Sequence, residues 1–529
     1  MTAHTESQSQ TNQAKGDSQL FEPGFVKQLG LVLGLSTAVY LLRGYLLQGF
    51  TRAESAFAEG AREMIANHEM LAPVYQKIPY FDKPPLFYWL TVGTFEVFGI
   101  NMLSSRVISI IAAILTTIVT ALFARHHFGK KTAIISAMVL STAMCYYEFA
   151  STCMPDMWLT LLELVVGIAF YQRFFGSSQK HLAWSCVAAL FAGLGWMIKG
   201  PVVLLFPGVA IVLQMVLSRR MPRLTFKEIA IGSAIFWAVV LPWHVAIYRV
   251  YGFESLNWLY LKGMLGRFLG KHELYNFGHG FSYMFVQLLS GFLPWTPFMV
   301  AAYFWLIKKL VKDKSLDSSV ADTGNAGERA SVISYLLIWS TFTVVFFALS
   351  SSNWGYYNLP IYPALAVVTA FAINHLGQVR FKKAELAAWL VFALTLAGTA
   401  VWSATALPNR ARKEEFLSLA QDLQKLPASV QFYCHNDLIG QYFLIDHVTF
   451  QSNRIPDYCD QAQLVERLKQ PAPAYFLMPE PDLIQLEPEV RAKLKVLKSV
   501  KFDFVKFPNC KLVPLGNGVL VQVVLVSKD

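Results

Sequence analysis

The sequence is organised around Tyr80-Phe81-Asp82-Lys83-Pro84-Pro85-Leu86-Phe87-Tyr88-Trp89-Leu90. An acid–base pair, Asp82-Lys83, directly precedes two prolines and then an aromatic and aliphatic run. A proline lacks a backbone N–H, fixes its own φ and disfavours the α region for the residue before it. The pattern predicts that Lys83 is held at a rigid corner beside a membrane, where a cation can meet an anion. It is also typical of a loop-to-helix junction with a snorkelling lysine.

The composition indicates a polytopic α-helical membrane protein. Of 529 residues, 55% are hydrophobic and 15% are charged, against roughly 25% charged residues in soluble domains. Many apolar runs approach the ~20 residues that cross a bilayer. The net charge of +11 lies mainly in loops, which indicates membrane topology and anionic substrates and argues against a nucleic-acid partner.

We expect about 11–13 transmembrane helices between residues 25 and 405. Eleven of them can be placed from the apolar runs, with ends that are uncertain by several residues. The expected spans are 25–47, 105–124, 132–150, 157–175, 182–198, 201–218, 228–248, 285–307, 331–350, 357–375 and 384–405.

Basic loops predict the orientation, because cytoplasmic loops carry an excess of Lys and Arg. These loops are 125–131, 219–227, 308–314 and 380–383. All four lie inside if Pro85–Gly99, which contains Glu96 and two glycines, does not cross the membrane. We therefore expect a membrane protein with a cytoplasmic N-terminus and the Lys83 corner on the outer surface.

Outside the predicted spans, the chain divides into four parts. Residues 1–24 read as a disordered cytoplasmic tail, since they are polar and unpatterned. Residues 48–104 and 249–284 read as outer loops, the first with an amphipathic surface segment. Residues 406–529 alternate helical and strand patterns, which predicts a small α/β domain on the periplasmic side.

Polar residues at membrane depth or in short outer loops are the candidate site, because ionisable groups near hydrocarbon are expensive and usually functional. Simpler interpretations remain open: Asp156 as a helix cap, Lys199 as a snorkelling lysine and Tyr357 as an interfacial aromatic. The candidates are Glu54, Asp82, Lys83, Asp156, Lys199, Arg267, His272, Asn353 and Tyr357.

Phe81–Trp89 closely resembles the signature of the bacterial aminoarabinose transferases. These belong with the protein O-mannosyltransferases among the GT-C-type glycosyltransferases, which use polyprenyl-phosphate sugars. The block Ala53–Met64 is similar to the family's Asp-Glu-x-Arg-Tyr-Ala-Glu-x-Ala-Arg-Glu-Met. Four further parts of the sequence are similar to elements of the same family: Asp156, Lys199-Gly200-Pro201, Arg267 with His272-Glu273, and the segment 350–360.

The resemblance implies a sugar donor carried on undecaprenyl phosphate and an acceptor that is lipid A, another glycan or a protein. The phosphate of the sugar donor would be held by Lys83, Arg267 and Tyr357, with support from Lys199. Glu54, Asp156 and Lys83 would be catalytic, and Asp82, His272 and Asn353 would complete the site. Stabilising the departing phosphate favours the transition state over the ground state.

The sequence departs from the family pattern at Ala53, where the family has Asp, and at Asn353, where it has Lys. A hydroxyl acceptor would then need Glu54 or Asp156 as its base, whereas a lipid A phosphate is already anionic. The alternatives are a protein O-glycosyltransferase and a non-catalytic lipid-binding or transport relative. We expect no cofactor, although a divalent metal near Asp82 and His272 is left open.

Overall fold

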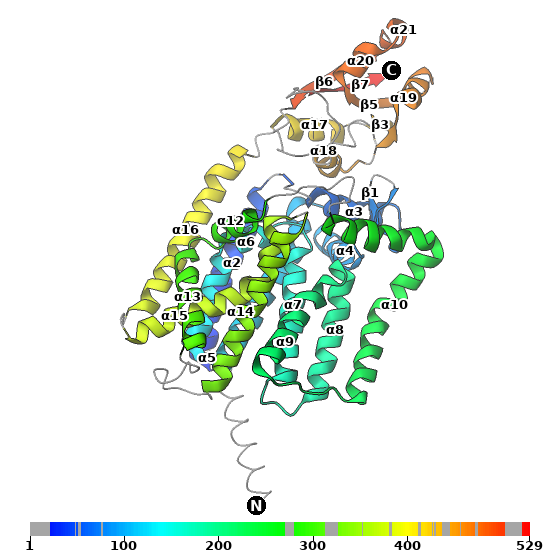
Figure 1. The fold of residues 1–529 in the computed structure, drawn as a ribbon. Helices are drawn as coiled ribbons and strands as arrows, with labels where there is room; N and C mark the ends of the chain where they lie inside the picture. The colour runs from blue at the N-terminus through cyan, green and yellow to red at the C-terminus, as the bar shows by residue number, and fades with distance from the viewer. Residues whose placement is uncertain are drawn as a thin grey trace, which may run out of the picture.

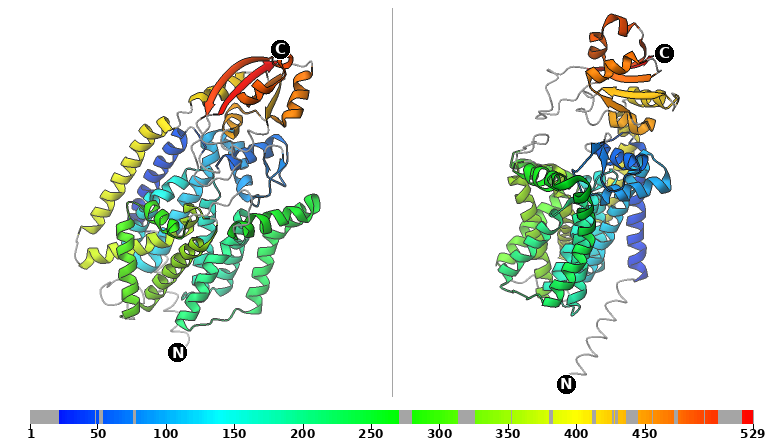
Figure 2. Two further views of the ribbon diagram at one scale, coloured as in Figure 1. Left: turned by 45° about the horizontal axis from the view of Figure 1, so that its top comes forward. Right: turned by 90° about the vertical axis from the view of Figure 1, so that its right-hand side faces the viewer.

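The computed structural model describes residues 22–47, 49–50, 54–75, 78–269, 280–312, 326–351, 353–379, 383–410, 414–425, 427, 430–435, 445–454, 456–470, 474–492, 494–502 and 521–528. They form a bundle of long apolar helices and a smaller α/β domain at one end of it (Figure 1). Two further views show the same arrangement (Figure 2).

The first part of the chain contains one crossing helix and then a compact surface layer. Helix α2 (Pro23–Leu46) begins with proline at its first turn, where the missing N–H costs nothing. Helix α3 (Glu54–Ala66), the hairpin β1–β2 (Val74–Tyr75 and Ile78–Pro79) and helix α4 (Leu86–Phe98) follow. Helix α4 has 13 residues, about 20 Å, which is too short to cross a bilayer.

Helix α5 (Met102–Thr142) consists of two arms that meet at Gly129, which has a φ of 83°. The Tyr146 hydroxyl, just beyond the second arm, donates to the Ala113 carbonyl in the first at 2.7 Å. The arms therefore run antiparallel, and the 41-residue element is two crossings. These are the spans predicted over 105–124 and 132–150.

The remaining bundle consists of helices that alternate between its two ends. Eight described helices are long and apolar enough to cross, and the bent pair α12–α13 is a possible ninth crossing. The second arm of α5 and the 17-residue α9 coincide with two more of the spans placed from the sequence, although α9 is shorter than the helices counted here. The elements are α6 (Met144–Ala150), α7 (Asp156–Phe174), α8 (His181–Lys199), α9 (Val202–Ser218), α10 (Phe226–Leu256), η1 (Asn257–Leu265), α11 (Gly266–Phe268), α12 (Ser282–Gly291), α13 (Thr296–Lys312), α14 (Ala326–Leu349), η2 (Gly355–Ile361), α15 (Tyr362–Val379) and α16 (Ala384–Arg410).

The basic loops meet at one end of the bundle, which we call the basic end. Close to the Gly129 turn, Lys130 pairs with Glu22 before α2, and Lys131 pairs with Glu385 at the start of α16. At the same end, Arg173 of α7 pairs with Glu228 in the first turn of α10. The opposite end carries α3, α4 and α6, and we call it the α3 end (Figure 1). Element η2 lies beside α6, because the Tyr356 ring packs against Phe149 at 5.0 Å between centroids.

The C-terminal residues form a mixed α/β domain. Its five-stranded sheet has the order β4-β3-β5-β7-β6, parallel where β3 pairs with β4 and β5, and antiparallel elsewhere. The strand patterns in this part of the sequence, at 430–433, 474–477 and 519–525, coincide with β3, β5 and β7. The elements are α17 (Glu414–Lys425), β3 (Gln431–His435), α18 (Ile445–Ser452), β4 (Asp457–Cys459), α19 (Gln461–Lys469), β5 (Ala474–Pro479), α20 (Glu480–Gln485), α21 (Pro488–Arg491), β6 (Leu494–Phe502) and β7 (Val521–Lys528).

Helix α3 is buried between the bundle and this domain rather than lying on an open membrane surface. Thr449 of α18 donates to Glu59 at 3.1 Å, and the Phe450 ring packs against Phe95 of α4. Glu59 also forms an ion pair with Arg62. Paired charges explain why a helix with four ionisable side chains can be covered on both faces.

Candidate active site

The centre of the candidate site is the ion pair between Lys199 and Asp156 at the α3 end. Lys199 is the last residue of α8, Asp156 is the first of α7, and their side chains approach to 2.6 Å. The ammonium also lies 5.0 Å and 5.7 Å from the ring centroids of Tyr357 and Tyr356. An aromatic face attracts a cation through its quadrupole, so the two rings and the carboxylate hold this charge in place.

Asp156 keeps one carboxylate oxygen available. Its Oδ1 accepts from Lys199, while its buried Oδ2 has no hydrogen-bond partner among the described residues. Its side chain is 3% exposed. The pattern at the start of α7 also allowed a simple helix cap, but no side-chain cap bond is formed there. The arrangement is that of a carboxylate with one oxygen able to accept a proton or a hydrogen bond.

The segment that contains the Asp82–Lys83 corner packs against the last turns of α8, the helix that ends at Lys199. The Lys83 ammonium is 2.9 Å from the Asp82 carboxylate and 3.0 Å from its carbonyl, and both side chains are largely buried. Phe81, just before them, packs on Tyr251 of α10 at 5.2 Å between ring centroids. Phe81 and Trp89 also join an apolar cluster with Met197, two residues before Lys199. The proline corner thus brings a second cation to the end of α8.

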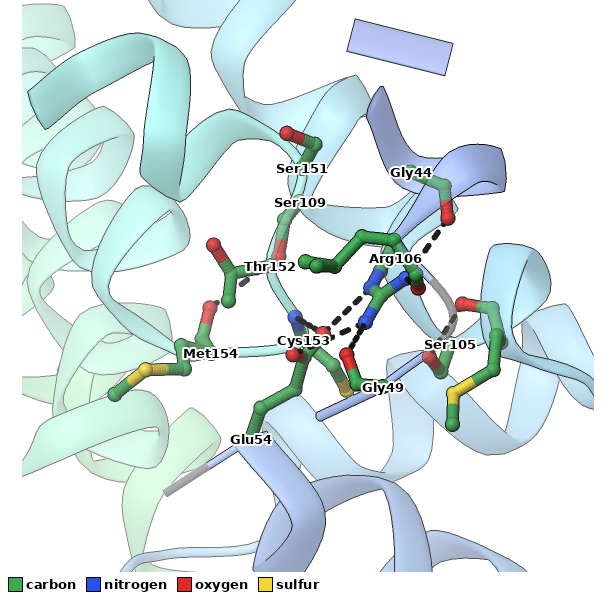
Figure 3. Close-up of polar contacts among 12 residues, drawn as sticks. Gly44, Gly49, Glu54, Ser105, Arg106, Ser109, Ser151, Thr152, Cys153 and Met154 are labelled. Carbon is green, nitrogen blue, oxygen red and sulfur yellow. Dashed lines mark hydrogen bonds and ion pairs between the residues drawn. The ribbon is translucent and has the colours of Figure 1, made fainter. Parts of the chain in front are cut away.

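Glu54 occupies a buried network, shown in Figure 3, rather than an open position. Its carboxylate pairs with Arg106 of α5 at 2.7 Å, and both side chains are fully buried. Arg106 also donates to the Gly44, Leu47 and Gly49 carbonyls. A guanidinium has five N–H donors, so it can bind the carboxylate and the three carbonyls at the same time.

The same network holds the loop that leads into Asp156. The Cys153 backbone N–H donates to Glu54 at 2.9 Å, and the Ser109 hydroxyl donates to the Met154 carbonyl at 3.3 Å (Figure 3). Burial raises the pKa of the Cys153 thiol well above its usual range, so this thiol is no nucleophile. Glu54 therefore holds in place the loop that leads into Asp156.

The predicted Tyr357 and Asn353 lie on the segment that closes the site. The Tyr357 ring packs on Phe347 at 4.9 Å, and Asn353 is fully buried and donates to the Phe347 carbonyl at 3.2 Å. The Ser351 N–H donates to the Phe268 carbonyl at 3.4 Å. Because Arg267 precedes Phe268 in α11, its backbone lies beside this segment. His272 and Ala53 lie outside the described residues, as does the Arg267 side chain.

Three polar features were not predicted from the sequence. Arg106 and Tyr356 gave no signal, since an arginine near a helix start and an interfacial tyrosine are ordinary. Glu163 gave a signal, an acid between Leu162 and Leu164 inside an apolar span. It is fully buried in α7, and neither carboxylate oxygen has a hydrogen-bond partner among the described residues.

Charges on α3 are also fixed by pairing. Burial opposes the charge of Arg62, but the Glu59 carboxylate beside it outweighs this effect, so the pKa of Arg62 is raised. Arg62 also donates to Asn453 of the C-terminal domain at 3.4 Å. This ion pair therefore joins the two parts of the molecule and is not available to a substrate phosphate.

One group in the described part of the chain has the composition of a metal site. His126, His127 and Glu328 place their ligand atoms within 4.8 Å of one another. They lie at the basic end, far from Asp82, where a divalent metal was left open.

Comparisons with known proteins agree with this architecture. Residues 82–245 match the dolichyl-phosphate-mannose-protein mannosyltransferase family. A protein of Erwinia tasmaniensis named undecaprenyl phosphate-alpha-4-amino-4-deoxy-L-arabinose arabinosyl transferase is 27% identical over 352 residues, 64% of this chain and 58% of that protein. An uncharacterized protein of Aquifex aeolicus is 24% identical over 360 residues, 67% of this chain and 66% of its own length. The chain thus spans less than two thirds of these relatives.

The fold is shared with a solved structure over nearly its whole length. The crystal structure of ArnT from Cupriavidus metallidurans bound to undecaprenyl phosphate superposes with a TM-score of 0.69 at 17% identity, covering 94% of this chain and 98% of that chain. The apo form of the same protein gives 0.70.

The protein is therefore a multi-pass membrane protein with the GT-C-type glycosyltransferase fold. Within that class, its sequence is similar to a protein named as an aminoarabinose transferase over 64% of its length and to the protein mannosyltransferase family over residues 82–245. The resemblance stated from the Phe81–Trp89 signature is confirmed.

Proposed function

We propose that this protein is an inverting glycosyltransferase of the bacterial inner membrane. It moves a sugar, 4-amino-4-deoxy-L-arabinose or another, from undecaprenyl phosphate to lipid A or a related envelope acceptor on the periplasmic side. The observation that carries this proposal is the Lys199–Asp156 pair above Tyr356 and Tyr357, with the Lys83 corner beside it.

The chemistry suits cations gathered at one end of the bundle. Breaking the bond between the anomeric carbon and the phosphate oxygen leaves a phosphate monoester with added negative charge. Lys83, Lys199 and Arg267 are assigned to this charge, and Tyr357 donates a hydrogen bond to it. Such groups accelerate the step because they bind the developing charge more strongly than the ground state.

The acceptor enters on the side of the sugar opposite the phosphate, which predicts inversion at the anomeric carbon. A lipid A phosphate attacks as an anion, whereas a hydroxyl acceptor passes its proton to the free Oδ2 of Asp156. Product with retained anomeric configuration would refute this single displacement.

The orientation and domain limits belong to the same proposal. Residues 1–24 and the basic end face the cytoplasm, the bundle 25–405 spans the membrane, and residues 406–529 form a periplasmic domain. The four basic loops support this orientation, since their described parts lie at one end of the bundle. Asp82, His272 and Asn353 border the donor site in this proposal.

A second function is favoured by one observation. The family matched over residues 82–245 is named for mannosyl transfer to protein, so a protein hydroxyl is the alternative acceptor. Mass spectrometry of lipid A and of periplasmic proteins, from cells with and without the gene, separates the two. A new sugar on lipid A supports the main proposal, and a new sugar on protein supports the alternative.

The cations are tested in the same cells. Lys83→Ala is expected to lower transfer about 10²-fold or more, the usual effect of removing one donor to a developing anion. Lys309→Ala, at the basic end, removes the same charge and is expected to leave transfer unchanged. Wild-type transfer by a membrane-inserted Lys83→Ala variant would favour a non-catalytic lipid-binding or transport relative.

A further inference from the structure

A cavity of about 430 Å³ lies at the basic end of the bundle, opposite the candidate active site. Its walls are the last turn of α7, the first turn of α8 and the connection from α9 to α10. None of the residues assigned to sugar transfer lies in it. It therefore calls for a separate explanation.

The cavity is positively charged, with nothing in the described structure to balance the charge. The side chains of Arg223, Lys227 and His181 line it, and none of these side chains has a hydrogen-bond or ion-pair partner among the described residues. Lys227 and Arg223 are exposed, whereas the Nδ1 atom of His181 is buried. Three basic side chains that line one cavity without an unpaired acid form a site for an anion.

The only acid in the lining is already neutralised. Glu228 forms an ion pair with Arg173 and accepts from the Thr225 backbone and hydroxyl at 2.8 Å each and from Ser185 at 3.1 Å. The Arg173 guanidinium in turn donates to the Arg223 carbonyl at 3.0 Å. This network fixes the shape of the cavity while leaving the charges of Arg223 and Lys227 uncompensated.

Helix ends strengthen the preference for an anion. His181 is the first residue of the 19-residue α8, whose preceding residue, Lys180, makes no side-chain cap bond. The first N–H groups of α8 therefore point out of the helix without a cap and carry partial positive charge. They add to the cationic side chains rather than replacing them.

The surroundings of the cavity indicate that the anion belongs to a lipid. The α9–α10 connection interleaves its cations with exposed apolar side chains: Met221 is 65% exposed, Leu224 46% and Phe226 84%. A phospholipid needs both kinds of side chain in one place. Its acyl chains pack on the apolar side chains, and its phosphate binds the unpaired cations. A free phosphate ion would leave these apolar side chains in water.

We infer that this cavity binds the headgroup of an anionic phospholipid in the leaflet at the basic end. The phosphate is held by Arg223, Lys227 and His181, and the acyl chains lie along Met221, Leu224 and Phe226. The bound lipid ties α7, α8 and α10 together at the end opposite the catalytic groups. This inference is independent of the proposed transfer activity.

The test is native mass spectrometry of the full-length purified protein with phosphatidylglycerol or phosphatidylcholine of the same acyl chains. The wild type is expected to retain phosphatidylglycerol preferentially. Arg223→Gln/Lys227→Gln is expected to weaken that binding about twentyfold, since each cation near the surface strengthens anionic lipid binding about fivefold. Thermal unfolding in detergent confirms that each variant is folded.

The matched control is Arg219→Gln/Arg220→Gln, which removes two charges from the same connection but from outside the cavity lining. It is expected to bind phosphatidylglycerol within about twofold of the wild type. Equal losses in both variants would show general surface attraction and overturn the site. Competition by millimolar inorganic phosphate as strong as that by phosphatidylglycerol would overturn the assignment to a lipid.

Discussion

Glu54 and Arg106 show how a signature residue can be held by a partner that is distant in the sequence. Their ion pair is fully buried and joins α3, α5 and the loop before Asp156. Removing one partner of a buried pair strands the other charge, which destabilises proteins by about 3–5 kcal/mol. We therefore expect Arg106→Ala to lower the free energy of unfolding by that amount, measured by chemical or thermal denaturation in detergent.

The control for this substitution is a surface pair. Lys262 and Glu254 are 2.5 Å apart, with side chains 50% and 65% exposed, and such pairs contribute about 1 kcal/mol or less. Lys262→Ala should therefore unfold close to the wild type. Equal unfolding of Arg106→Ala and Lys262→Ala would show that the buried pair does not hold the site together.

The Lys199–Asp156 pair allows stability and function to be separated. Lys199→Met leaves Asp156 buried and unpaired and is expected to destabilise the protein by about 3–5 kcal/mol. Adding Asp156→Asn removes the stranded charge, so the double variant should recover most of the stability. Sugar transfer should stay low in both variants, because the cation beside Tyr357 is absent. A stable double variant with wild-type transfer would reduce the pair to a structural role.

Single residues differ in how far the sequence could predict them. Asp156, Lys199 and Tyr357 each stand at a helix end between apolar runs, so their shared end of the bundle followed from alternating spans. The position of Arg106 could not be predicted in this way, because its partner Glu54 is 52 positions away and only packing brings the two side chains together. The buried pairing of Glu54 with Arg106 was not predicted either, since an ion pair between distant residues leaves no local pattern.

At the scale of elements, Gly129 decides whether α5 is one helix or two. Its φ of 83° and ψ of 176° fall in a region that is essentially restricted to glycine. A Cβ there would meet nothing within 4 Å, so the penalty for Gly129→Ala is conformational alone. We expect a loss of about 1–3 kcal/mol in the free energy of unfolding.

The comparison for that variant is Gly34→Ala in α2, where a Cβ also meets nothing within 4 Å but the backbone is helical. Alanine there should be neutral or stabilising by up to about 1 kcal/mol. If both alanine variants unfold alike, the backbone conformation at Gly129 is not what separates the two arms.

Helices and strands could be predicted where the length of an apolar run, or the spacing of its apolar residues, is characteristic of one type of element. The apolar spans followed from length, and the two arms of α5 followed from the basic residues between them. The strands β4 and β6 were not predicted, because Asp457–Cys459 has only three residues and Leu494–Phe502 alternates with lysines that read as a surface segment. The burial of α3 depends on α18, nearly 400 residues away, and no local pattern contains that information.

At the scale of the whole molecule, one aromatic side chain links the two parts. Phe450 of α18 is 4% exposed and packs edge-on against Phe50 at 4.9 Å and near Phe95 at 5.9 Å. Truncating a buried Phe costs about 3–5 kcal/mol. Phe450→Ala should therefore loosen the domain from α3, which hydrogen exchange would detect as faster exchange across Glu54–Ala66.

The reference variant is Leu497→Ala, on the exposed face of β6 and 41% exposed. It should leave exchange in α3 unchanged while altering the same domain. Unchanged exchange in α3 with Phe450→Ala as well would show that the contact does not hold the domain in place.

The orientation of the whole molecule determines whether the proposed chemistry is possible. A lipid-linked donor is needed only where nucleotide sugars are absent, so Lys83 and the C-terminal domain must face the periplasm. Alkaline phosphatase, which is active only outside the cytoplasm, should therefore be active when fused after residue 529. The same enzyme inserted in the α9–α10 connection, between Arg219 and Thr225, should be inactive, because that basic connection is expected to be cytoplasmic. The reverse pattern would place the cations of the candidate site inside the cell and remove the basis for transfer from undecaprenyl phosphate.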